Sequence, residues 1–219
     1  MIDYSQVKIL RENKVYRMSD VVMGYGPRHQ IDRETILAEP QYRETILHDY
    51  LVKCPSTCDK QVFVDVVQQH TQRYNQANPN DLVMHVRLGD VMQPELAETK
   101  QEIRCKSIYH TYAQLFYKHG QWIRQHGRVT IVTALHFGAN ELNGKYYYTE
   151  EAEHNSFETL RRLVEVFESW DMKVSIQSSL NVDEDFCFMA SSQQFVGSTS
   201  KFAELVSWCL KDSATCHLM

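Results

Sequence analysis

Beyond residue 80, short β-branched runs alternate with longer amphipathic stretches, and this alternation limits the possible folds more than any other feature of the chain. The runs with the pattern of a buried strand are 81–88, 128–135, 173–177 and 194–197. The stretches with a helical spacing of apolar residues are about 106–125, 156–170, 183–192 and 200–211. Strands that alternate with helices of this length indicate βαβ units. We therefore expect an α/β fold in which helices flank a mostly parallel sheet.

The first part of the chain is patterned differently. Its pattern is mostly helical, most clearly over 60–72, where apolar residues recur at i, i+3 and i+4. A turn signal, Asn-Pro-Asn, separates the two parts. We predict a small, mainly helical portion at 1–79 and a sheet-containing domain at 80–219. Within that domain, 137–155 is predicted to be a polar, tyrosine-rich loop, and Ser156 is predicted to cap the helix that follows.

The composition bears on partners and compartment. Lys+Arg 23 against Asp+Glu 28 gives a net charge of -5, whereas a nucleic-acid-binding face needs a clustered basic surface. No apolar run approaches the roughly 18 residues of a membrane span, and charges fall where a signal peptide would be apolar. Among the cysteines, only Cys54-x3-Cys58 comes near the spacing of a zinc knuckle. We expect a soluble, cytoplasmic protein that holds no metal and binds neither nucleic acid nor membrane.

The first strand of the predicted sheet ends in the sequence HVRLGD, residues 85–90. In open α/β sheets a ligand lies outside the carboxyl ends of the strands. His85 and Arg87 are two residues apart, so their side chains point to the same side of a strand. An arginine fork beside an imidazole donor suits a phosphate. The alternative is that Arg87 pairs with Asp90 and that His85 is a core residue with satisfied hydrogen bonds.

The last strand of the predicted sheet runs into a turn rich in hydroxyl groups. In the sequence FVGSTSKFAELVSW, residues 195–208, Ser198, Thr199 and Ser200 precede a helix, and Lys201 adds a cation. Backbone N–H groups at a helix N-terminus, together with the helix dipole, favour an anion. The alternative is an ordinary Ser/Thr helix cap without a ligand.

Together, these two segments resemble the α1,2-, α1,6- and protein O-fucosyltransferase superfamily. HVRLGD is similar to the H-x-R-x-G-D motif of that superfamily, and the segment from Asp185 to Val206 is similar to its second signature. The resemblance covers residues 81–211. It implies a Rossmann-like donor domain of the GT-B fold and an inverting transfer by direct displacement. It also implies a GDP-sugar donor, with GDP-fucose first, a glycan or protein acceptor, and no metal or other cofactor.

The resemblance assigns roles to particular positions. Arg87 would bind the β-phosphate of GDP and stabilise the charge on this leaving group. His85 would help to hold the nucleotide, and Asp185 would accept hydrogen bonds from the guanine edge. The residues that would cradle the phosphates are Ser198, Thr199, Ser200 and Lys201.

The resemblance is less complete for the catalytic base and for the first half of the fold. Glu95 stands ten residues after His85, where α1,6-type members carry a catalytic base, and Asp90 is the second candidate. Gly24 and Gly26 would be the remnant of a glycine-rich loop that reaches the donor. Members of the superfamily have a second Rossmann-like domain before the first motif, but only 84 residues precede His85 here. The expected function is a GDP-fucose-type glycosyltransferase. The alternatives are a non-catalytic nucleotide- or sugar-binding module and an α/β scaffold whose motif matches are accidental.

Overall fold

The computed structural model describes residues 2–12, 18–23, 33–54, 59–92, 100–140, 145–146 and 149–218. The strands in this part of the chain are β1 (Ile9–Glu12), β2 (Leu82–His85), β3 (Leu88–Gly89), β4 (Arg128–Val132), β5 (Leu135–Asn140), β6 (Lys145–Tyr146), β7 (Lys173–Gln177), β8 (Gln194–Gly197) and β9 (Thr215–Leu218). The α-helices are α1 (Met18–Met23), α2 (Arg33–Ala38), α3 (Ile46–Lys53), α4 (Lys60–Thr71), α5 (Lys100–Arg124), α6 (Glu150–Glu168), α7 (Val182–Ala190) and α8 (Lys201–Cys209). Short 3₁₀ helices lie at η1 (Tyr4–Gln6), η2 (Pro40–Tyr42) and η3 (Asp90–Met92).

The main sheet has five strands in the order β7-β4-β2-β8-β9, and each neighbouring pair is parallel. When these strands are numbered along the chain, their order is 3-2-1-4-5, which is the order of a doubly wound, Rossmann-like half. The expected mostly parallel α/β sheet is therefore confirmed. The order reverses between β2 and β8, so the carboxyl ends of these two strands mark the position at which such sheets bind ligands.

A second, smaller sheet continues the first beyond its carboxyl edge. It has the order β1-β5-β3 in parallel, and β6 pairs antiparallel with β5. β3 follows β2 after two residues, and β5 follows β4 after Thr133 and Ala134. The backbone N–H of Lys8 donates to the Ser178 hydroxyl at 2.9 Å, so β1 begins where β7 ends. In space, three neighbouring strands of the main sheet, β7, β4 and β2, are thus each continued by a strand of the second sheet, β1, β5 and β3.

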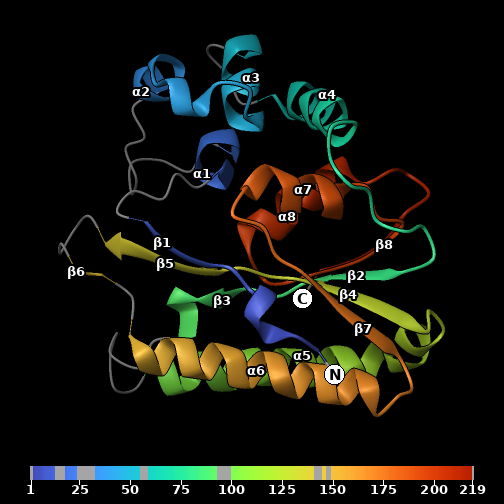
Figure 1. Cartoon of the computed structure of the whole chain (residues 1–219). Coiled ribbons are helices and arrows are strands. Elements are labelled where there is room, and N and C mark those ends of the chain that lie inside the picture. Colours follow the sequence, from blue (N-terminus) through green and yellow to red (C-terminus); the bar gives the residue numbers. More distant parts are fainter. Residues whose placement is uncertain are drawn as a thin grey trace.

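Helices cover both faces of the main sheet (Figure 1). α5 and α6 cover one face, in a core that includes Met84, Ile131 and Phe167. α7 and α8 cover the opposite face, together with the helices of the N-terminal portion. We call these two sides the α5/α6 face and the α7/α8 face. Each fully buried phenylalanine contributes about 1.5–3 kcal/mol to stability relative to an exposed one.

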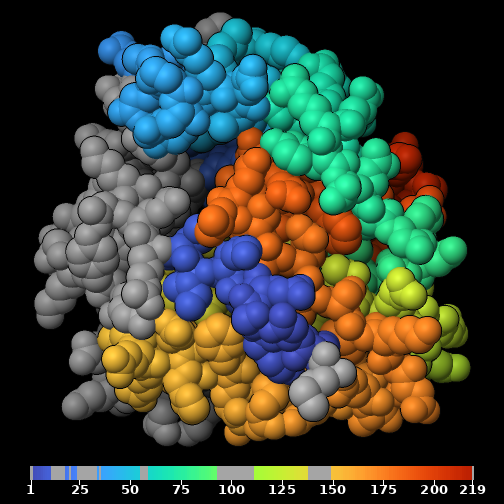
Figure 2. Space-filling view, viewed as in Figure 1, coloured from blue at the N-terminus to red at the C-terminus, as the bar shows by residue number. Residues whose placement is uncertain are grey.

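The helices of the N-terminal portion share their core with the α7/α8 face, whereas Val7, just before β1, lies in the core of the α5/α6 face. The described residues of 1–79 form helices and the strand β1. Phe63 of α4 makes edge-to-face contacts with Tyr50 of α3 and Phe186 of α7, with ring centroids 5.6 and 5.8 Å apart. The Asp183 carboxylate of α7 accepts a hydrogen bond of 2.9 Å from the backbone N–H of Ile46. In Figure 2 the helix α4 accordingly lies directly beside α7.

Two expectations about the segment after β4 are wrong in part. The predicted strand 128–135 stops at Val132, and the predicted loop 137–155 contains most of β5, all of β6 and the first turns of α6. Thr149 caps α6, because its hydroxyl accepts from the N–H of Ala152 at 3.0 Å. Ser156, the expected cap, lies inside α6. Its hydroxyl donates to the Ala152 carbonyl and accepts from the N–H of Gly89 at 3.1 Å, so Ser156 ties α6 to β3.

Candidate functional site

The two sequence signatures meet where the strand order reverses. His85 ends β2 and Ser198 follows β8, and their side chains are hydrogen-bonded at 2.9 Å although 113 residues separate them. The Ser198 hydroxyl donates to that of Ser200 at 2.9 Å. The Ser200 hydroxyl in turn accepts from the N–H of Ala203 at 3.2 Å, as the N-cap of α8. The three side chains in this series of hydrogen bonds are all buried: His85, Ser198 and Ser200.

His85 is neutral under ordinary conditions. Burial lowers the pKa of its imidazole to about 3, and the positive charges of Arg87 and His136 act in the same direction. Its ring also packs on Phe202 of α8, with centroids 5.5 Å apart. Because Ser198 donates to Ser200, the Ser198 oxygen is left to accept from Nδ1 of His85. His85 therefore brings no charge to a ligand, and its hydrogen bond fixes the position of the β8–α8 turn relative to β2.

The geometry of Arg87 fits in part both roles considered from the sequence, a ligand of a phosphate and a partner of Asp90. Its guanidinium faces the Asp90 carboxylate, but both N···O distances are 3.4 Å, longer than a strong charge-assisted hydrogen bond. The Arg87 side chain is 40% exposed. Exposed pairs of this kind contribute about 0–1 kcal/mol to stability. The guanidinium can therefore reorient towards an anion at little cost in stability.

The remaining residues of the β8–α8 turn are exposed. Thr199 lies at the surface between the two buried serines. The ammonium group of Lys201 forms a 2.6 Å ion pair with Glu204, one turn further along α8. Lys201 thus has a partner on its own helix, and binding a phosphate would require this exposed pair to exchange.

Asp185 lies apart from this group, in the first turn of α7, with its carboxylate at the end of β7. Its carboxylate accepts hydrogen bonds of 3.1 Å from both the Gln177 side-chain amide and the Ser179 backbone N–H. Burial raises the pKa of Asp185 to about 6, and these two hydrogen bonds oppose the rise. β4 and β2 separate β7 from β8, so about 14 Å of sheet lies between Asp185 and Ser198. A ligand that contacts both groups has to cross the ends of β4 and β2.

The other predicted site residues, Gly24, Gly26 and Glu95, lie outside the described residues.

Two polar residues that the sequence analysis did not single out lie at the same edge. Thr133 follows β4 and is 2% exposed, and within the described part of the chain its hydroxyl has no hydrogen-bond partner. His136, on β5, pairs with Gly89 of β3. Their position after the run 128–132 is the signal that could have identified them, since parallel strands bring their carboxyl ends to one edge.

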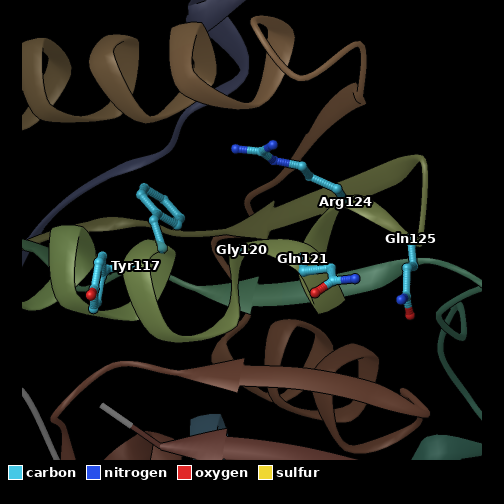
Figure 3. A pocket seen from close by; sticks show the side chains of 6 residues that line it. Tyr117, Gly120, Gln121, Arg124 and Gln125 are labelled. Atoms are coloured by element: carbon cyan, nitrogen blue, oxygen red, sulfur yellow. The ribbon is translucent and has the colours of Figure 1, made fainter.

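A surface hollow lies elsewhere. An open depression of about 550 Å³ lies along the last turns of α5, and its lining residues come from that helix and from Gln125, which directly follows it (Figure 3). This end of α5 leads into the amino end of β4, so the depression is at the opposite edge of the sheet from His85. A smaller hollow lies between Tyr4 and α6. Over the described residues, no group of His, Cys, Asp or Glu side chains could hold a metal ion, and no helix could span a membrane.

Comparisons with models of protein families, with curated proteins and with solved structures find no match to this chain.

Proposed function

We propose that this chain binds a nucleotide-sugar at the carboxyl ends of β2 and β8 and is a glycosyltransferase that uses a GDP-sugar, with GDP-fucose as the first candidate. One observation carries the proposal. The reversal of strand order lies between the strands that bear the two sequence signatures, and a direct hydrogen bond of 2.9 Å joins His85 of the first to Ser198 of the second. Motifs from distant parts of the chain thus converge where doubly wound sheets bind nucleotides.

The chemistry follows from the charge of each group. In an inverting transfer the acceptor oxygen attacks the anomeric carbon, its proton passes to a base, and GDP leaves with the electrons of the glycosidic bond. Arg87, half-exposed and weakly paired, would bind the β-phosphate and stabilise the charge that develops there. Asp90, whose carboxylate faces the Arg87 guanidinium, is a candidate base, because a carboxylate can take up the proton of the acceptor hydroxyl.

A second candidate function is a non-catalytic nucleotide-binding module of the same fold. Two observations favour it. GT-B catalysis takes place between two Rossmann-like domains, whereas the described part of 1–79 forms helices that share a core with α7 and α8 and a single strand, β1, that belongs to the second sheet. Both carboxylate oxygens of Asp185 are also used by internal hydrogen bonds. Turnover of GDP-fucose, measured as GDP release with and without added glycan acceptors, separates this function from the first.

Binding is tested by thermal unfolding with GDP, UDP or ADP, since a ligand of the folded state raises Tm. We expect GDP to raise Tm most. Arg87→Lys should lose at least about tenfold in GDP affinity, because lysine keeps the charge but not the two-pronged geometry. The matched control is Arg128→Lys, whose side chain is also half-exposed and faces Asp81 at 3.8 Å, but at the amino end of β4. Equal affinities in both variants and the wild type would show that the anion binds elsewhere.

A further inference from the structure

A cluster of aromatic rings joins the edge strand β9 to helix α5. β9 is the last strand in the order of the main sheet and pairs with β8 over four residues. Its residue His217 is in register with Val196, whose side chain lies in the core of the α5/α6 face. Residues in register on paired strands point to the same side of the sheet. The half-buried imidazole of His217 therefore points to the α5/α6 face, on which α5 lies.

The His217 ring contacts two side chains of α5. Its centroid is 4.3 Å from that of His119, with the two ring planes 37° apart. It is 4.6 Å from the ring of Trp122, which it meets edge to face. His119 and Trp122 are three residues apart in α5, so they share one face of the helix. These ring contacts hold β9 on α5 in addition to its pairing with β8.

A positive charge on these rings has no counter-ion within the described residues. Neither His119 nor His217 forms a hydrogen bond or an ion pair there. Burial lowers the pKa of His217, and the positive charge of His119 acts in the same direction. The third titratable group of the cluster is His126, which packs on Trp122 with ring centroids 5.0 Å apart and whose pKa is also lowered by burial. From β8, His217 faces the apolar Val196. The charge that these groups gain in acid is therefore entirely positive.

We propose that His119 and His217 form an acid-sensitive latch, in which the neutral rings hold β9 on α5 and a positive charge on both rings releases β9 from its place beside β8. β9 gives way and α5 does not, because α5 is 25 residues long and its Ile123 is fully buried, whereas β9 has four residues at the edge of the sheet. Release exposes the unpaired backbone groups of β8, with which another strand can pair. Nothing in this latch depends on the proposed nucleotide-sugar binding.

The direction of the pH dependence follows from the charges. The folded state disfavours the charged form of His217, so its pKa is lower in the folded chain than in the unfolded one. The latch therefore contributes its full stability above the ordinary histidine pKa of about 6.5 and loses it as the pH falls below that value.

Hydrogen exchange measures the release. The β9 amides are protected while the strand is paired, and that of Thr215 donates to the Gln193 carbonyl at 2.8 Å. We expect the protection factors of β9 to fall about tenfold from pH 7 to pH 5, since one linked proton changes an equilibrium by up to about tenfold per pH unit. The amides of the central strand β4 should keep their protection. In His119→Phe, which keeps a ring at the contact but cannot take up a proton, β9 should stay protected at pH 5. His154→Gln, at an exposed histidine of α6, is the matched control and should behave as the wild type.

An NMR titration of the histidine rings is the second measurement. In the wild type, His217 should titrate below the ordinary value of about 6.5, and His119→Gln should raise its pKa because the neighbouring charge is gone. Wild-type β9 amides that keep their protection at pH 5 would overturn the latch. An equal loss of protection in His119→Phe and in the wild type would do the same, since the release would then not need a charge at position 119. A His217 ring that titrates at the ordinary value would show that the two imidazoles are not in contact, and would also refute the inference.

Discussion

Replacing Gly89 with alanine tests how tightly β3 is held against β5. Gly89 has φ +88°, in the left-handed region that L side chains rarely adopt. A Cβ built on it would lie 2.4 Å from the carbonyl oxygen and 2.6 Å from the backbone nitrogen of His136. Backbone atoms in a paired strand cannot rotate away as the end of a side chain can. Alanine at position 89 must therefore push the two strands apart.

A second glycine provides the matched control. Gly127, between α5 and β4, also has a positive φ of +64°, but a Cβ there would meet nothing within 4 Å. The left-handed conformation alone costs about 1–2 kcal/mol for an L residue, and this applies to both positions. Forced displacement of packed atoms adds about 1–3 kcal/mol, which applies only to Gly89. We expect Gly127→Ala to lower the free energy of unfolding by about 1–2 kcal/mol and Gly89→Ala by about 2–5 kcal/mol.

Thermal unfolding followed by calorimetry or circular dichroism measures the difference. For a chain of this length, 1 kcal/mol corresponds to about 2–4 °C in Tm. Gly89→Ala should also weaken GDP binding, because β3 follows Arg87 directly and pairs with the strand that carries His136, whereas Gly127→Ala should not. Equal losses of stability in the two variants would refute the argument, since they would mean that β3 separates from β5 without resistance.

Two further predictions concern buried polar groups at the same edge. Thr133→Val should leave the free energy of unfolding unchanged or raise it by about 1 kcal/mol, because a buried hydroxyl with no partner among the described residues is lost. Thr130→Val should lower it by about 1 kcal/mol, because its hydroxyl is bonded to that of Ser175 at 2.8 Å. Urea unfolding measures both, and a clear loss in Thr133→Val would reveal a partner for that hydroxyl. The pKa of Asp185 rises from 3.8 to about 6 in the folded protein, so the folded state retains a proton that the unfolded chain has lost between these values. Wild-type stability should therefore fall by about 3 kcal/mol as the pH rises through that window, and remain level above it, whereas Asp185→Asn should lack this slope. An unchanged slope in the variant would assign the proton to another group.

The main sheet could largely be predicted from the sequence. Runs such as 173–177 contain β-branched residues and lie between two helices of ordinary length. Local pattern and tertiary structure therefore agree there. The strand β9, with the sequence TCHL, lacks such a pattern and was missed. It is four residues long and is held by its pairing with β8, which no local signal encodes. The helical pattern after Ser156 suits a helix cap at that residue, which is why a cap was expected. Its hydrogen bond with the N–H of Gly89, a residue distant in sequence, explains why a serine lies inside α6.

The candidate site was predicted where it depends on spacing within one segment. His85 and Arg87 share a face because they are two residues apart in an extended chain. The approach of Ser198 to His85 and of His136 to Gly89 depends on which strands are neighbours. That information is non-local, and it was available for Ser198 only through the resemblance of two distant motifs to one family. No motif includes His136; its place after the run 128–132 indicates the edge of the sheet, and its approach to Gly89 became apparent from the pairing of β3 with β5.

The continuation of the main sheet into the second one affects the entropy of ligand binding. The residues between β2 and β3 are held at both ends by strand pairing, and the N–H of Val86 also donates to the Val132 carbonyl at 3.0 Å. Ordering one residue of backbone on binding costs about 1–2 kcal/mol, and for Arg87 that ordering is already complete in the free protein. Binding there has to immobilise only the end of the arginine side chain. Affinity at this edge should therefore respond to side-chain chemistry much more than to solvent conditions that stiffen or loosen loops.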